Sequence, residues 1–209
     1  MLDADFLDWW FSPWRYAVRS PAGLAPALEP LARRDGYRLW CRQANLPADL
    51  PASLEPAWQL VATDDGAALR ASARLFAGLL AARGQRRDAL AALAFAERKW
   101  CMAVAATQPL QGCRAPPYTA DDALEVVGLV ELARRLETQF AGLWPRLRLT
   151  LPEPLAERVD ALLARVAGES VEASARRAQR CWSLCRQRAA VTWAPNAGPV
   201  ADTELMKRG

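Results

Sequence analysis

The acidic residues that stand in adjacent pairs are the first candidates for chemistry in this sequence. Asp64-Asp65 and Asp121-Asp122 each bring two carboxyl groups together, as acid–base catalysis requires. Each pair also stands where a predicted helix begins, and the free backbone N–H groups of a first helical turn stabilise negative charge. Helix capping therefore explains both pairs, and we predict no catalytic residue.

The chain contains no histidine, and this excludes most other catalytic arrangements. Ser-His-Asp and Cys-His catalysis use imidazole as the general base, and the H-E-x-x-H and two-histidine iron sites use it as a ligand. The glycine-rich phosphate loops G-x-x-x-x-G-K and G-x-G-x-x-G are absent from the sequence as well. The sequence thus predicts a protein that is not an enzyme and that holds no metal and no cofactor.

The cysteines are odd in number and contain no C-x-x-C pair; they are Cys41, Cys101, Cys113, Cys181 and Cys185. The N-terminus is acidic, where a signal peptide would be basic, so we expect a cytosolic protein with reduced thiols. Two of the cysteines lie four residues apart, but a four-thiolate zinc site would need thiols from distant segments. We interpret the cysteines as small buried hydrophobic residues.

Alanine and leucine, both strong helix formers, dominate the 209 residues, and alternating β-branched runs are almost absent. The sequence predicts an all-α fold: one multi-helix domain over residues 1–194 and a flexible tail over 195–209. No apolar stretch is long enough to span a membrane. Helices are expected over 2–11, 13–20, 37–44, 65–83, 85–106, 153–167 and 169–193, and from the Thr119-x-x-Asp122 capping box to Phe140.

Two of these elements are expected to position the rest. The helices over 65–83 and 85–106, joined at Gly84, predict an antiparallel hairpin at the centre of the protein. Residues 143–152 differ, because Leu147, Leu149 and Leu151 alternate with polar residues. This period of two predicts one short extended segment.

Trp40, Trp100 and Trp182 fall on apolar helical stripes and are expected in the core.

The N-terminal segment is rich in aromatic residues, and its Phe6, Trp9 and Trp10 fall on one helical stripe. Two interpretations are open: the cluster packs on the helical core, or it forms a docking surface, since Trp, Tyr and Arg often anchor interfaces. The candidate protein-binding residues under the second interpretation are Trp9, Trp10, Trp14, Arg15 and Arg19.

The last predicted helix has an apolar arc and a basic side. The arc contains Val171, Ala175, Ala178, Cys181, Trp182, Cys185, Ala189 and Trp193, and the arginines lie outside it. The basic side is either a solvated face or a surface for an acidic partner. The formal net charge is only +4 and no nucleic-acid-binding motif is present, so nucleic acid is not expected. The candidate residues are Arg176, Arg177, Arg180 and Arg188, with Arg186 beside them.

Two short motifs resemble the SctK family of bacterial type III secretion systems. They are F-x-P-x-x-Y at Phe11–Tyr16 and W-x-x-L-x-L-x-L-P at Trp144–Pro152. The resemblance implies a non-catalytic adaptor of the cytosolic sorting platform, at the cytosolic face of the inner membrane. Its implied partners are the forkhead-associated-like cytoplasmic domain of the ring protein SctD and the pod protein SctQ. The alternative is a helical regulator that binds a small ligand or nucleic acid.

Overall fold

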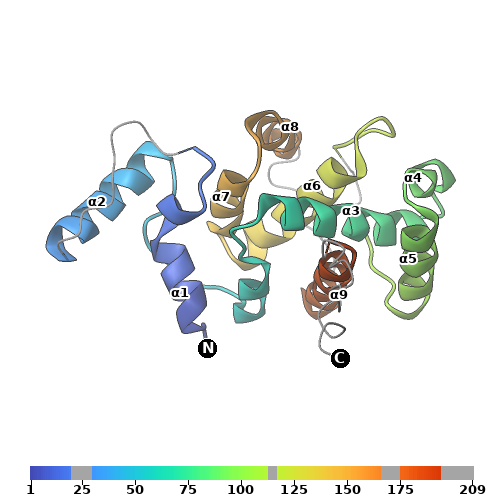
Figure 1. The fold of residues 1–209 in the computed structure, drawn as a ribbon, viewed down its shortest axis with the longest axis horizontal. Helices are drawn as coiled ribbons and strands as arrows, with labels where there is room; N and C mark the ends of the chain where they lie inside the picture. Colours follow the sequence, from blue (N-terminus) through green and yellow to red (C-terminus); the bar gives the residue numbers. More distant parts are fainter. Residues whose placement is uncertain (20–29, 113–116, 166–174, 194–209) are drawn as a thin grey trace, which may run out of the picture.

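Helices make up the regular structure of this computed structural model, which describes residues 1–19, 30–112, 117–165 and 175–193. No strand occurs in these ranges, so the all-α prediction is confirmed. The long helix α3 (Gly66–Arg83) crosses the middle of the molecule (Figure 1). It packs against α6 (Leu124–Gln139), α9 (Ala175–Trp193) and α5 (Phe95–Thr107).

The limits of α3 follow from its capping residues, as predicted. The Asp65 carboxylate accepts hydrogen bonds from the backbone N–H groups of Ala67 and Ala68, at 2.8 and 3.2 Å, and Gly84 follows the last helical turn. In the middle of α3 the backbone of α6 comes very close. A Cβ atom on Gly128 would lie 1.9 Å from the carbonyl oxygen of Ala73, so only glycine allows this packing.

The predicted central hairpin is corrected in two respects. Its second arm is two helices, α4 (Arg87–Ala91) and α5, because the chain is extended at Ala94 and the Glu97 carboxylate accepts a hydrogen bond from the Ala94 N–H. The hairpin is also only one side of the centre, since α6 and α9 contact α3 as well. Trp182 is buried as expected, whereas Trp100 is half-buried.

The predicted extended segment over 143–152 is wrong. Residues Leu143–Leu147 form α7 and Arg148–Thr150 form a 3₁₀ turn, η3. Gly142, at φ 86°, adopts a left-handed conformation that turns the chain directly from α6 into α7. The alternation was misleading because it required Arg146 to face solvent, and the Arg146 side chain is completely buried.

The N-terminal region lies at one end of the molecule, opposite to α4 and α5 (Figure 1). Helix α1 (Ala4–Phe11) agrees with the prediction, but the helix expected over 13–20 is only a 3₁₀ turn, η1 (Pro13–Arg15). Helix α2 (Pro30–Gln43) is longer than the expected 37–44. It contributes Tyr37, Trp40 and Cys41 to a second hydrophobic cluster, where Trp40 is buried as expected.

The remaining elements complete the frame of the candidate site. The 3₁₀ helix η2 (Pro56–Val61) follows a non-helical segment and buries Trp58 completely. Thr119 and Asp122 form a hydrogen-bonded turn two residues before α6 rather than its first turn. Helix α8 is Glu153–Ala164. Residues 166–174, which belong to the predicted helices over 153–167 and 169–193, and the predicted flexible tail over 195–209 lie outside the described residues. None of the described helices combines the length and apolar character needed to cross a membrane.

Candidate functional site

The N-terminal aromatic residues divide between the core and the surface. Trp9 is 8% exposed and stacks on Tyr16 at 4.6 Å between ring centroids, and Trp10 is fully buried against Phe140. The core interpretation therefore holds for both residues: Trp10 is inaccessible to a partner, and Trp9 keeps only a small exposed edge. Trp14 is half-buried, with its ring edge-on to Tyr37.

The two arginines beside this cluster are exposed and paired. Arg15 forms an ion pair with Asp8 of α1, and Arg19 forms one with Glu153 at the start of α8. Both pairs are solvated on each side, so they contribute little to stability and can exchange for partner contacts.

Helix α9 presents its basic side to solvent, as its pattern indicated. Its inward-facing residues are buried, namely Ala178, Cys181, Trp182, Cys185 and Ala189. Arg176, Arg177 and Arg180 are exposed, and Arg188 is half-buried. Within the described ranges the three exposed guanidinium groups form no ion pair, although Arg177 donates a hydrogen bond to the Pro109 carbonyl oxygen at 3.3 Å.

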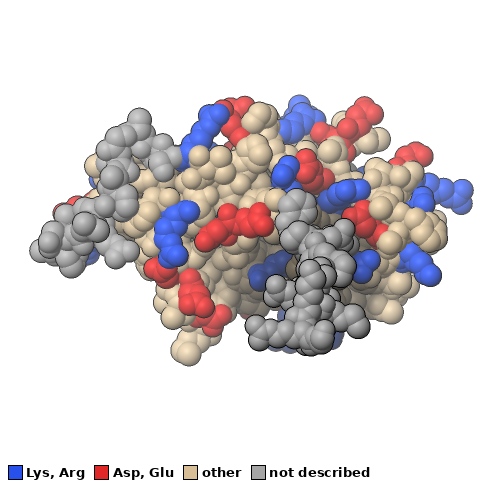
Figure 2. Space-filling view, in the orientation of Figure 1, with Lys and Arg blue, Asp and Glu red and all other residues tan. Residues whose placement is uncertain are grey.

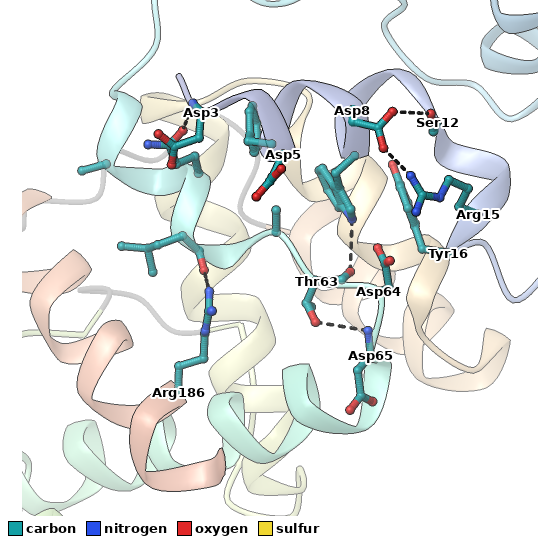
Figure 3. A pocket seen from close by; sticks show the side chains of 16 residues that line it. Asp3, Asp5, Asp8, Ser12, Arg15, Tyr16, Thr63, Asp64, Asp65 and Arg186 are labelled. Atoms are coloured by element: carbon teal, nitrogen blue, oxygen red, sulfur yellow. Dashed lines mark hydrogen bonds and ion pairs between the residues drawn. The ribbon is translucent and has the colours of Figure 1, made fainter. Parts of the chain in front are cut away.

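A groove of about 1040 Å³ opens between α1, η1 and the chain from η2 to the start of α3, and Arg186 of α9 reaches its edge (Figure 3). Five aspartates line it, against two arginines: Asp3, Asp5, Asp8, Asp64, Asp65, Arg15 and Arg186. Figure 2 shows acidic side chains gathered over α1 and over the start of α3 on this face. A chain with a basic net charge therefore carries a distinctly acidic groove.

The five carboxylates fall into two groups. Asp8 is engaged by Arg15 and by the Ser12 hydroxyl, and Asp65 caps α3, so these two are occupied by local structure. The carboxylates of Asp3, Asp5 and Asp64 are exposed and have no hydrogen-bond or ion-pair partner among the described residues. Three negative charges thus remain available to a ligand.

The floor of the groove is aromatic. Phe6, Trp9 and Tyr16 line it, and the Trp9 indole N–H donates to the Thr63 carbonyl oxygen at 3.3 Å. The Tyr16 hydroxyl is buried and lacks a hydrogen-bond partner within the described part of the chain. Burial raises the pKa of Tyr16, and the positive charge of Arg146 only partly opposes this, so the hydroxyl keeps its proton as a free donor.

A smaller cavity of about 340 Å³ adjoins the groove and shares Thr63, Asp65 and Arg186 with it. Its other lining is largely apolar and comes from α3 and α9, with Ala68, Leu69, Trp182, Ala189 and Ala190 among the residues. At the junction of the two spaces, the Arg186 guanidinium donates a hydrogen bond to the Leu60 carbonyl oxygen.

The side chains that line the groove are suited to binding a charged ligand. In the described part of the chain no three Cys, Asp or Glu side chains are placed to hold a metal ion. The thiols of Cys41, Cys101, Cys181 and Cys185 are free and buried, as the sequence predicted. Burial raises the pKa of the Cys101 thiol to about 12, so the thiol stays protonated and is a poor nucleophile. Three free carboxylates above an aromatic floor are suited to a cationic group.

Three arginines are buried in the described residues, and sequence reasoning missed the contacts of the two that are fully buried, Arg135 and Arg146. Arg135 forms an ion pair with Glu131 at 2.6 Å, and both side chains are fully buried; the Glu–Arg spacing of four residues was the available signal. Arg146 places its guanidinium 3.6 Å from the centroid of the Trp10 ring, and no local pattern indicated this.

Comparison with known proteins adds no relative. No protein-family model matches the chain, and neither the curated proteins nor the solved structures include a significant match to it. A proposal about function therefore has to be argued from the residues of this chain and their geometry.

Proposed function

We propose that this chain is a non-catalytic adaptor that holds two other proteins together through surfaces of opposite charge. The observation that carries the proposal is the pairing of the acidic groove beside α1 with the exposed arginines of α9 on one helical frame. Surfaces of opposite sign select different partners, because each repels the proteins that suit the other.

The SctK-like motifs suggest which proteins these are. We propose the cytoplasmic domain of SctD and the pod protein SctQ, at the cytosolic face of the inner membrane. In support, the two motif-bearing segments lie together: the Val18 N–H, just after the first motif, donates to the Leu149 carbonyl oxygen of the second at 2.8 Å. Arginine suits such contacts, since its guanidinium binds carboxylates in a bidentate manner.

The test is co-purification of the intact chain with the SctD cytoplasmic domain and, separately, with SctQ at low salt. Arg176→Glu/Arg180→Glu should abolish binding of one partner and preserve binding of the other. Arg38→Glu/Arg42→Glu changes the net charge equally at exposed positions of α2 and should preserve both. Failure of both partners to bind the unaltered chain rejects the adaptor assignment.

The alternative of a nucleic-acid-binding regulator requires a continuous basic groove. The groove between α1 and α3 is acidic, so it repels phosphate groups, and the described structure offers this alternative no specific support.

A further inference from the structure

We infer that the groove beside α1 binds a segment of a partner protein that carries lysine or arginine next to an apolar side chain. The inference rests on the adaptor role proposed above and names the chemistry of one of the two partners. The basic side chain enters the acidic groove, and the apolar side chain enters the adjoining cavity between α3 and α9.

The charge of the groove selects a cation. Asp3 and Asp5 come from the start of α1, and Asp64 comes from the segment before α3 on the other side (Figure 3). Their carboxylates are exposed and, among the described residues, unpaired. An arginine or lysine side chain placed between the two walls would form charge-assisted hydrogen bonds without displacing an existing ion pair.

The floor adds a feature that an acidic surface patch lacks. Tyr16 is 5% exposed, lines the groove and carries a protonated hydroxyl without a partner in the described ranges. Figure 3 shows its side chain beside Arg15, between Asp8 and Asp64. An unfilled donor in a buried position is costly unless a ligand supplies an acceptor, and the backbone carbonyl oxygens of a peptide are such acceptors.

The adjoining cavity argues for a peptide rather than a free cation. A metal ion or a small amine would fill only part of a groove of about 1040 Å³ and would make no use of an apolar space of about 340 Å³ beside it. Leu69 and Trp182 give that space a wall suited to a branched or aromatic side chain. The two spaces are contiguous at Thr63, Asp65 and Arg186, as one continuous chain requires.

Arg186 determines the orientation in which the partner segment binds. It is the one lining arginine that reaches both spaces, and it stands at their junction, where it donates to the Leu60 carbonyl oxygen. Its positive charge repels a basic side chain from the α9 end. The segment therefore binds with its basic residues toward α1 and its apolar residue toward α9.

A displayed library of random dodecapeptides tests the inference, selected at low salt against the intact chain. The selected peptides should be enriched in lysine or arginine at a fixed spacing from an apolar residue. In fluorescence anisotropy, the most enriched peptide should bind Asp5→Asn/Asp64→Asn about tenfold more weakly than the unaltered chain. Asp35→Asn/Asp88→Asn removes two exposed carboxylates outside the groove and should leave the affinity unchanged.

Other outcomes overturn the inference. They are a selected pool without basic residues, equal affinities for the two double variants, or an affinity that does not fall when the apolar residue of the peptide becomes serine. Displacement of the peptide by micromolar spermidine would indicate a polyamine site instead. If the peptide binds as expected while neither SctD nor SctQ co-purifies, the groove assignment stands and the named partners fail; the reverse result rejects only the groove.

Discussion

The two sides of α1 use charge in opposite ways. On the inner side, Arg146 is fully buried and lies over the Trp10 ring, at 3.6 Å. On the outer side, Asp5 is exposed at the groove and has no partner in the described residues. The inner charge is held by the protein itself, whereas the outer one is left for another molecule.

The inner arginine is satisfied without a carboxylate. Its guanidinium donates to the carbonyl oxygens of Trp10 and Pro47, at 3.3 and 2.8 Å, and to the Tyr37 hydroxyl at 2.9 Å. These contacts tie α1, α2 and the following loop to α7. Residue type therefore does not separate structural charges from functional ones in this arginine-rich chain. The distinction is whether the protein itself already satisfies the hydrogen-bonding capacity of each charged group.

The largest expected effect on stability comes from removing the buried guanidinium group of Arg146. Arg146→Met leaves several buried acceptors without a donor, and we expect a loss of about 3 kcal/mol in the free energy of unfolding. Urea unfolding followed by tryptophan fluorescence measures this. Arg148→Met is the matched control, because Arg148 is 41% exposed and pairs with Asp160 at the surface; it should cost about 1 kcal/mol or less. Equal losses in the two variants would refute the contrast between enclosed and exposed arginines.

Two tyrosine hydroxyls test the same contrast between groups with and without hydrogen-bond partners, and the expected changes in unfolding free energy are smaller. The Tyr37 hydroxyl accepts from Arg146 and donates to the Ala48 carbonyl oxygen at 2.5 Å, so Tyr37→Phe should cost about 1–2 kcal/mol. The Tyr16 hydroxyl is also buried but lacks a partner in the described chain, so Tyr16→Phe should leave the unfolding free energy unchanged or slightly raised. The same urea experiment decides, and a larger loss for Tyr16→Phe than for Tyr37→Phe would contradict the assignment of an unfilled donor to the groove.

The sequence predicted those parts of the fold that local chemistry determines. The limits of α3 follow from Asp65 and Gly84, and the buried face of α9 follows from its apolar spacing. One failure had a local signal, because the break at Ala94 is capped by Glu97 three residues later. The other came from interactions distant in sequence: the buried position of Arg146 in α7 depends on carbonyl groups of residues 99 and 136 positions away.

The groove could not be predicted for the same reason. Its walls come from residues 3–16, 57–65 and 186, which no local pattern brings together. Asp64 illustrates this point. Its position next to Asp65 suggested a helix cap, yet only Asp65 caps α3, and Asp64 contributes a free carboxylate to the groove.

The smallest expected effect concerns the ion pair between Arg158 and Asp122, which is intermediate between the buried Arg146 and the exposed Asp5. Arg158 of α8 is 42% exposed, whereas the Asp122 side chain that it contacts is only 6% exposed; the guanidinium–carboxylate distances are 2.9 and 2.5 Å. Burial raises the pKa of Asp122, but hydrogen bonds from the Thr119 N–H and from Arg158 outweigh it and lower the pKa overall.

A lowered folded-state pKa stabilises the protein above the unfolded-state value of about 3.9, and this contribution is lost as the pH falls through the folded-state pKa. The unaltered chain should therefore lose more stability between pH 5 and pH 3 than Arg158→Gln does, by about 1 kcal/mol or less because Arg158 is partly solvated. Urea unfolding at a series of pH values measures the difference. Parallel curves for the two proteins would mean that Arg158 does not hold the Asp122 carboxylate, and that this pair belongs with the solvated surface charges.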